Sequence, residues 1–291
     1  MKRQAASRAF DAQLLAIVEE FDSMSVRQVF YQAVVRGVVE KAEKEYGRVQ
    51  RALVLLRRSG AMPYSTIVDG SRVRECLDGW EGLADYADSV AGWYRREMWT
   101  SQQTRVEVWC EKEGLSGIIR PVCDEYGVTF VATRGIQSLT LDYESAQNML
   151  DKPTRLFYFG DHDPTGRHIS DRLEGALREH GAMVAVERIA LEPEQIKLYK
   201  LPTRPASKGK REDGRERDSR FAGFKAEYGT RAVELDALPP DVLQELVREA
   251  VESAIEDREA WDRVMAAEKA ERESVRTICA GIIGVAPEGR A

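Results

Sequence analysis

A buried strand runs into an acidic turn in the stretch Arg155-Leu156-Phe157-Tyr158-Phe159-Gly160-Asp161-His162-Asp163-Pro164-Thr165-Gly166. The first five residues are mostly bulky and apolar, which favours a strand, whereas Asp, Pro and Gly together favour a turn. A helix is expected to begin at about Gly166 and to end near Glu179. The stretch therefore predicts a strand–turn–helix unit with two carboxylates, Asp161 and Asp163, at the carboxyl end of its strand.

The same alternation of strand and helix continues on both sides of this unit. Further strands are expected at residues 106–110, 128–132 and 183–191, and further helices at 115–126 and from the turn at Gly135 to about 150. Strands that alternate with helices indicate an α/β domain with a mostly parallel sheet and a functional site at the carboxyl ends of the strands. We predict this domain at residues 105–238, followed by a C-terminal helical tail at 239–291.

The N-terminal region has a different pattern, with apolar residues at helical spacing. It predicts a helix at 10–21, a second helix capped by Ser25 and stopped by Gly37, and a third at 42–59 before Gly60. A short strand and turn are expected at 61–70. Three helices followed by a hairpin indicate a winged helix-turn-helix domain at residues 1–71, which is an α unit beside the α/β domain. Residues 72–104, rich in Trp and Tyr, are expected to form a helical connector.

The composition of the chain argues against a disulfide-rich, zinc-binding or membrane-spanning protein. The chain has 291 residues, with 43 Lys and Arg against 49 Asp and Glu and a net charge of −6 at pH 7. Its 4 cysteines form no Cys-x-x-Cys pair and it has only 3 histidines, which argues against a disulfide framework or a zinc site. No apolar run approaches the ~20 residues of a membrane span, and we expect a cytoplasmic protein.

Basic residues are concentrated in two regions of this acidic chain. Residues 1–60 hold 11 basic and 7 acidic residues, residues 197–220 hold 9 and 4, and residues 232–275 hold 5 and 13. Such segregation favours a polyanionic partner such as double-stranded DNA, although ordinary solvated surfaces are the alternative. The predicted DNA-binding side chains follow one side of the third helix: Lys44, Arg48, Arg51 and Arg58. The segment 197–220 is a second candidate and is expected to be a loop that is mobile without DNA.

Three carboxylates follow strands of the predicted sheet. Glu111 comes directly after the strand at 106–110, and Asp161 and Asp163 follow the strand at 155–159. Side chains alternate along an extended segment, so the two aspartates are expected to point the same way. Three carboxylates in one pocket would repel, and Mg²⁺, or Mn²⁺ in its place, would be their natural partner. The alternative is a solvated turn without a metal.

Tyr31 lies beside the expected core stripe of the second helix and four residues after Arg27, so the two side chains should be neighbours. A phenol with a pKa near 10 is a weak nucleophile at neutral pH, and a guanidinium would stabilise its phenolate or bind the phosphate under attack. Lys112 is a further candidate for a phosphate contact. The alternatives are a packing role for Tyr31 and a solvent-exposed Lys112.

Three motifs together resemble a known family. Glu111-Lys112-Glu113-Gly114, Thr133-Arg134-Gly135 and Asp161-His162-Asp163-Pro164-Thr165-Gly166 look like a Toprim domain. They are most similar to the A subunit of topoisomerase VI and to the related meiotic double-strand-break transesterase, in the compact stand-alone versions called Mini-A. Ser25-Val26-Arg27-Gln28-Val29-Phe30-Tyr31 is similar to the segment that ends in that family's catalytic tyrosine, and the resemblance extends to Val233-Glu234-Leu235-Asp236-Ala237-Leu238.

The resemblance implies a Mg²⁺-assisted DNA-strand transesterase, a type II topoisomerase of the A-subunit kind. Tyr31 and Arg27 would be catalytic, and Glu111, Asp161 and Asp163 would hold the metal. The family works as a homodimer whose site is shared between subunits, and it links tyrosine to the 5′ end of DNA. No phosphate-binding loop of an ATPase is present, so strand passage would need a separate ATPase subunit. The alternatives are a metal-dependent Toprim nuclease that uses water and a non-catalytic DNA-binding module.

Overall fold

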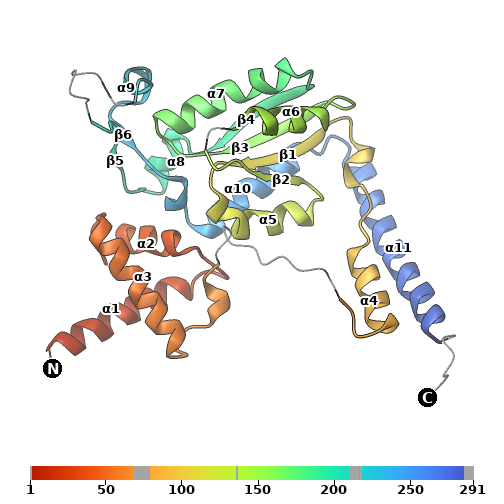
Figure 1. Ribbon diagram of the computed structural model, residues 1–291, viewed down its shortest axis with the longest axis horizontal. Helices are drawn as coiled ribbons and strands as arrows, with labels where there is room; N and C mark the ends of the chain where they lie inside the picture. The colour runs from red at the N-terminus through yellow and green to blue at the C-terminus, as the bar shows by residue number, and fades with distance from the viewer. Residues whose placement is uncertain (1, 69–78, 136, 210–215, 217, 285–291) are drawn as a thin grey trace.

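The computed structural model describes residues 2–68, 79–135, 137–209, 216 and 218–284 (Figure 1). Its centre is a four-stranded sheet in the order β2-β1-β3-β4. The strands are β1 (Arg105–Cys110), β2 (Thr129–Ala132), β3 (Thr154–Phe159) and β4 (Val184–Ala190). All the neighbouring pairs are parallel, with Cys110 opposite both Ala132 and Phe159. The predicted α/β class and the parallel sheet are confirmed.

Helices cover both faces of this sheet because side chains alternate along each strand. On one face Val108 and Phe157 join a core with α5 (Ser116–Glu125) and α10 (Pro240–Ser253). On the other face Trp109 and Tyr158 join a core with α6 (Leu139–Gln147) and α7 (Pro164–Glu179). Figure 1 shows the two helix pairs above and below the strands. Both faces of β1 and β3 are therefore buried, so a functional site is expected at the carboxyl ends of the strands.

Three N-terminal helices pack on the same core as α5. They are α1 (Lys2–Val18), α2 (Val26–Val35) and α3 (Glu43–Arg58). Ser25 caps α2 as predicted, since its hydroxyl accepts from the backbone N–H of Gln28 (3.2 Å). After α3 the chain turns at Gly60, whose φ of +76° suits glycine.

The predicted strand of the wing is wrong for the part of 61–70 that the structure describes. Residues 61–68 contain a short 3-10 helix, η1 (Tyr64–Thr66), and a single parallel bridge between Met24 and Ile67. Asp69 and Gly70 lie outside the described residues. The three helices of the predicted domain are thus observed. Residues 61–68 do not form a hairpin, and Ile67 pairs instead with Met24 in the α1–α2 connection.

The predicted connector and tail pack together as one arm. Helix α4 (Leu83–Trp93) lies along α11 (Arg258–Gly284), as Figure 1 shows at the right of the molecule. At the base of the arm Trp99, in η2 (Met98–Ser101), packs on Trp261 with ring centroids 5.0 Å apart. The acidic tail is helical as predicted, but it forms two helices, α10 and α11. No helix in the described ranges is long and apolar enough to span a membrane.

A small unit beside the sheet contains the segment that was expected to be a loop. Helix α8 (Pro193–Leu198) precedes strand β5 (Arg204–Pro205), which pairs antiparallel with β6 (Arg231–Ala232). Helix α9 (Phe221–Tyr228) lies between them in the chain. Within 197–220 the regular structure is the end of α8 and strand β5, and most of the other described residues form a loop as expected. Residues 210–215 and 217 lie outside the described residues.

Candidate functional site

Glu111 and Asp161 meet at the carboxyl edge of the sheet. The backbone N–H of Asp161 donates to Oε2 of Glu111 (2.9 Å), which joins the ends of β1 and β3. This approach needs glycine at Gly166, where a Cβ would lie 2.3 Å from the carbonyl oxygen of Asp161 and 2.9 Å from Glu111 Oε2. Burial raises the pKa of Glu111. The sequence thus predicted correctly that these two carboxylates would be neighbours.

Asp163 points elsewhere and is already engaged. Its Oδ1 accepts from the backbone N–H groups of Thr165 (2.9 Å) and Gly166 (2.8 Å), so that it caps α7. Its Oδ2 pairs with the Arg204 guanidinium (2.9 Å). An N-terminal cap contributes about 0.5–2 kcal/mol to helix stability. Asp163 therefore has a structural role in α7, whichever reaction the site performs.

Lys112 lies at the centre of an acidic cluster that the sequence did not predict. Its ammonium pairs with Asp161 (3.0 Å), Glu234 (3.2 Å) and Asp236 (3.0 Å). Burial disfavours the charged amine, but the three carboxylates outweigh burial and raise the pKa of Lys112. Glu234 and Asp236 belong to the turn around η4 (Leu235–Ala237). Their only sequence signal was their place in the final motif of the family resemblance.

The Asp161 carboxyl is held through both of its oxygens. Its Oδ1 accepts from the backbone N–H of Leu235 (2.8 Å) and its Oδ2 pairs with Lys112. Burial raises the pKa of Asp161 to about 7, although the Lys112 ammonium lowers it, and the neighbouring Glu111 charge adds to the rise. The pKa of this carboxyl is therefore well above that of an ordinary aspartate.

A buried arginine holds the loop between β3 and α7 in place. Arg188 of β4 donates to the carbonyl oxygens of Gly160 (2.8 Å), Asp161 (2.6 Å) and Gly166 (3.0 Å). The guanidinium binds three carbonyls in fixed directions, so it orients the backbone from which Asp161 projects. This contribution was not predicted from the sequence, because β4 was predicted only as a strand.

The three predicted metal ligands do not converge on one point. Within the described ranges there is no group of three or more His, Cys, Asp or Glu side chains placed to hold a metal ion. Asp161 is paired with Lys112 and Asp163 with Arg204. A divalent cation bound by all three predicted carboxylates would have to displace both ion pairs. The predicted set, as it is arranged here, does not fit Mg²⁺.

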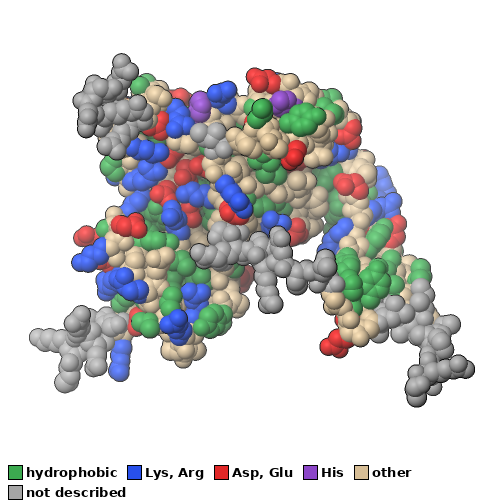
Figure 2. Space-filling view, in the orientation of Figure 1, with side chains coloured by type: hydrophobic (Ala, Val, Ile, Leu, Met, Phe, Trp, Pro, Cys, Tyr) green, Lys and Arg blue, Asp and Glu red, His purple; other side chains and the backbone are tan. Residues whose placement is uncertain are grey.

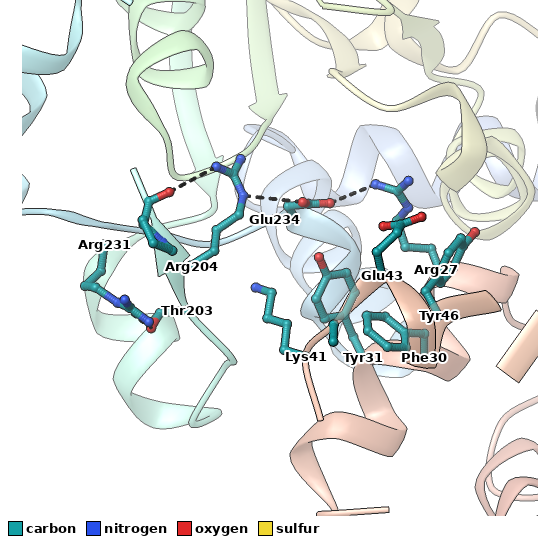
Figure 3. Close-up of a pocket in the computed structure, with 12 residues that line it drawn as sticks. Arg27, Phe30, Tyr31, Lys41, Glu43, Tyr46, Thr203, Arg204, Arg231 and Glu234 are labelled. Atoms are coloured by element: carbon teal, nitrogen blue, oxygen red, sulfur yellow. Dashed lines mark hydrogen bonds and ion pairs between the residues drawn. The ribbon is translucent and has the colours of Figure 1, made fainter. Parts of the chain in front are cut away.

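A pocket of about 450 Å³ opens beside this cluster, between the N-terminal helices and the β5–β6 unit (Figure 3). Two aromatic hydroxyls, Tyr31 and Tyr46, line it together with two carboxylates, Glu43 and Glu234. Four cations also line it, and they come from segments far apart in the chain: Arg27, Lys41, Arg204 and Arg231. The pocket is therefore rich in groups that bind oxyanions.

Tyr31 is more buried than its helical position suggested. Only 4% of the residue is exposed, and its ring joins the core while Figure 3 shows the phenol oxygen pointing toward Glu234. Burial, reinforced by the Glu234 charge, raises the pKa of the phenol. The Lys41 ammonium lies over the ring, 5.0 Å from its centre. In this arrangement the phenol is protonated at neutral pH.

The hydrogen-bond and ring contacts of Arg27 are with groups other than the Tyr31 phenol. Its guanidinium donates to Glu234 (2.9 Å) and lies over the ring of Tyr46, 5.7 Å from the centre. The contacts of Arg27 thus go to the carboxylate beside Tyr31.

The basic stripe of α3 faces away from the pocket. Lys44, Arg48, Arg51 and Arg58 are all exposed, and none of them lines the pocket. Arg48 pairs with Glu45 (3.1 Å) and lies over the ring of Phe10. Figure 2 shows Lys and Arg side chains gathered on the side of the molecule formed by the N-terminal helices and the β5–β6 unit. The predicted stripe and the pocket cations are therefore two separate basic groups.

Glu234 is expected to contribute strongly to stability. Burial alone would raise its pKa, but Lys112, Arg27 and Arg204 lower it to about 2, from an ordinary value of 4.5. A depressed carboxyl pKa stabilises the fold above pH 4.5, and this stabilisation is lost as the pH falls through about 2. We expect Glu234→Gln to lower the free energy of unfolding at pH 7 by about 3 kcal/mol. Urea denaturation at pH 7 and at pH 3 measures the free energy of unfolding of both proteins. The difference between Glu234→Gln and wild type should be smaller at pH 3. An equal difference at the two pH values would contradict the stabilising role of the Glu234 charge.

Comparison of the sequence with models of protein families and with curated proteins found no match to this chain. The resemblance to the Toprim domain therefore rests on the motifs themselves.

Proposed function

We propose that the protein is a DNA-strand transesterase in which Tyr31 attacks a phosphodiester. One observation carries the proposal: a tyrosine hydroxyl lies at the wall of a pocket that is lined by four cations and adjoins the Lys112 cluster. A phosphodiester needs cations around its oxygens and a nucleophile in line with phosphorus. The pocket brings cations and a tyrosine hydroxyl together from α2, β5 and β6, which supports this proposal.

The proposed step exchanges one phosphate ester for another. A bond forms between the Tyr31 oxygen and phosphorus, and the bond between phosphorus and the 3′ oxygen breaks. The phenol proton passes to water, and the departing 3′ oxygen takes up a proton from water, so the 5′ phosphate stays linked to tyrosine. Arg27, Lys41 and Arg204 would balance the charge that develops on the phosphoryl oxygens. The reverse step reseals the strand without an external energy source.

Magnesium has no step in this scheme, because the predicted ligands do not converge in this arrangement. Magnesium dependence remains a prediction of the family resemblance, with Glu111 and Asp161 as the carboxylates that do lie together. Cleavage of supercoiled plasmid with Mg²⁺, with Mn²⁺ and with a chelator tests it. The homodimer and the separate ATPase subunit are likewise proposals, and light scattering with and without DNA tests the first.

The exposed stripe on α3 is proposed to hold the DNA duplex outside the pocket. Each phosphate contact that is lost should reduce the salt dependence of binding by about 0.9 in the slope of log K against log salt. We therefore expect Arg48→Ala combined with Arg51→Ala to reduce this slope by about 1.8 and to weaken binding at low salt.

Fluorescence anisotropy with a labelled duplex over a range of salt concentrations measures this change. Glu19→Gln, an exposed residue of the α1–α2 connection, is the control and should leave the slope unchanged. An unchanged slope in the double variant would exclude the α3 stripe from the DNA contact.

A further inference from the structure

The carboxylate of Glu234 is held by cations from three separate parts of the fold. Its Oε2 accepts from Arg27 of α2 (2.9 Å) and from Lys112 after β1 (3.2 Å), and its Oε1 faces Nε of Arg204 in β5 (3.4 Å). Figure 3 shows this carboxylate between the two guanidinium groups, with the Tyr31 hydroxyl beneath it. Three donors that converge on one anion form the arrangement that also binds phosphate oxygens.

The surroundings of Glu234 carry further positive charge. Lys41 donates to the carbonyl oxygen of Pro202 (2.7 Å), and Arg231 donates to the hydroxyl of Thr203 (2.6 Å), so both are held against the pocket by neutral partners. The Glu234 side chain is 16% exposed and lines the pocket, which leaves a route for it to turn outward. Its removal would leave Arg27 without its carboxylate partner, and Lys112 and Arg204 would each lose one of the carboxylates that they bind.

We propose that Arg27, Lys112 and Arg204 form a phosphate subsite, that Glu234 occupies this subsite as an internal anion, and that a DNA phosphate enters beside Tyr31 when Glu234 turns outward. This inference rests on the proposed function, because it places the phosphodiester of that reaction. It also assigns a role to Glu234, which excludes phosphate until a stronger or multivalent anion replaces it.

A physical consequence for the nucleophile follows from this exchange. Glu234 is one of the groups that raise the pKa of Tyr31, while Lys112 lowers it. When Glu234 leaves, the phenol loses a neighbouring negative charge while the cations remain. Entry of the phosphate and activation of Tyr31 would thus be coupled, since the same movement opens the subsite and favours the phenolate.

The test compares Glu234→Gln with wild type in binding two probes, inorganic phosphate and a short DNA duplex. Removal of the competing charge should increase the affinity for each by about tenfold or more, because the subsite is then open in a larger fraction of molecules. Titration calorimetry measures phosphate binding and anisotropy measures duplex binding. Glu43→Gln, which changes the other carboxylate lining the pocket, is the matched control and should bind as wild type does.

Two further variants locate the subsite. Arg204→Ala added to Glu234→Gln should cancel the gain, and Arg27→Ala alone should weaken phosphate binding even if Glu234→Gln proves too unstable to study. No gain in Glu234→Gln, or an equal gain in Glu43→Gln, would overturn the proposal, as would Arg27→Ala binding phosphate like wild type. If Glu234→Gln binds phosphate more tightly than wild type but binds the duplex no more tightly, the proposal that the DNA backbone enters the subsite is overturned. These experiments measure binding and not cleavage. A failure of the proposed Tyr31 chemistry would therefore be detected separately, in the cleavage assay.

Discussion

Tyr31→Phe is expected to abolish the formation of DNA covalently linked to protein, with cleavage falling by about 10³-fold or more. The substitution removes one oxygen and keeps the ring in the core, so folding and DNA affinity should be nearly unchanged. The assay incubates supercoiled plasmid with the protein, stops the reaction with detergent and divides the sample with and without protease. Wild type should give broken DNA that enters a gel normally only after protease treatment.

Two tyrosines serve as controls for this experiment. Tyr46 lines the same pocket, where Arg27 covers its ring, and Tyr64 is 65% exposed in η1. Tyr46→Phe and Tyr64→Phe should therefore retain cleavage. Cleavage that persists in Tyr31→Phe without linked protein would favour a nuclease that uses water. Loss of cleavage in Tyr46→Phe alone would keep the chemistry but move the nucleophile.

Lys112→Ala is expected to lower the free energy of unfolding by about 3–5 kcal/mol at pH 7, the range found when one partner of a buried ion pair is removed. Its ammonium, with 19% of the side chain exposed, is the shared partner of Asp161, Glu234 and Asp236. Without it, three carboxylates would repel one another in a site with little water. Urea denaturation followed by circular dichroism measures the change.

Two comparisons distinguish this effect from a general loss of a lysine. Lys44→Ala, on the exposed side of α3, should change stability by less than about 0.5 kcal/mol. Asp161→Asn added to Lys112→Ala should recover part of the loss, because it removes one of the repelling charges. A Lys112→Ala protein as stable as wild type would mean that the cluster does not depend on this amine.

The sequence was sufficient for the sheet because each strand carries its own local signal. Apolar runs such as 155–159 have to be buried on both faces, and the alternation with helices leaves a parallel sheet as the simple solution. Ser25 at the start of α2 and the neighbouring positions of Glu111 and Asp161 were predictable for the same reason. They depend on residues close in the chain or on the ends of adjacent strands.

The strand of the wing and the direction of Asp163 differ from the prediction, because each depends on partners that spacing cannot reveal. Ile67 forms a single bridge to Met24 in the α1–α2 connection, and residues 64–66 form a 3-10 helix where a strand was expected. Asp163 has the correct spacing to Asp161, but the first turn of α7 and Arg204 take up its oxygens. Local pattern indicates which residues can bind, whereas competition among neighbours decides what they bind.

The sequence by itself determined the α/β class, the three N-terminal helices and the carboxylates at the sheet edge, since these follow from periodicity and from short-range capping. Only the tertiary structure decided that Tyr31 faces Glu234 and that Lys112 gathers three carboxylates. Glu234 lies more than two hundred residues from Arg27 in the chain, and the pair forms because α2 packs against η4. Charges at such separation leave no periodic signal, and their mutual attraction acts only after the apolar core has brought their elements together.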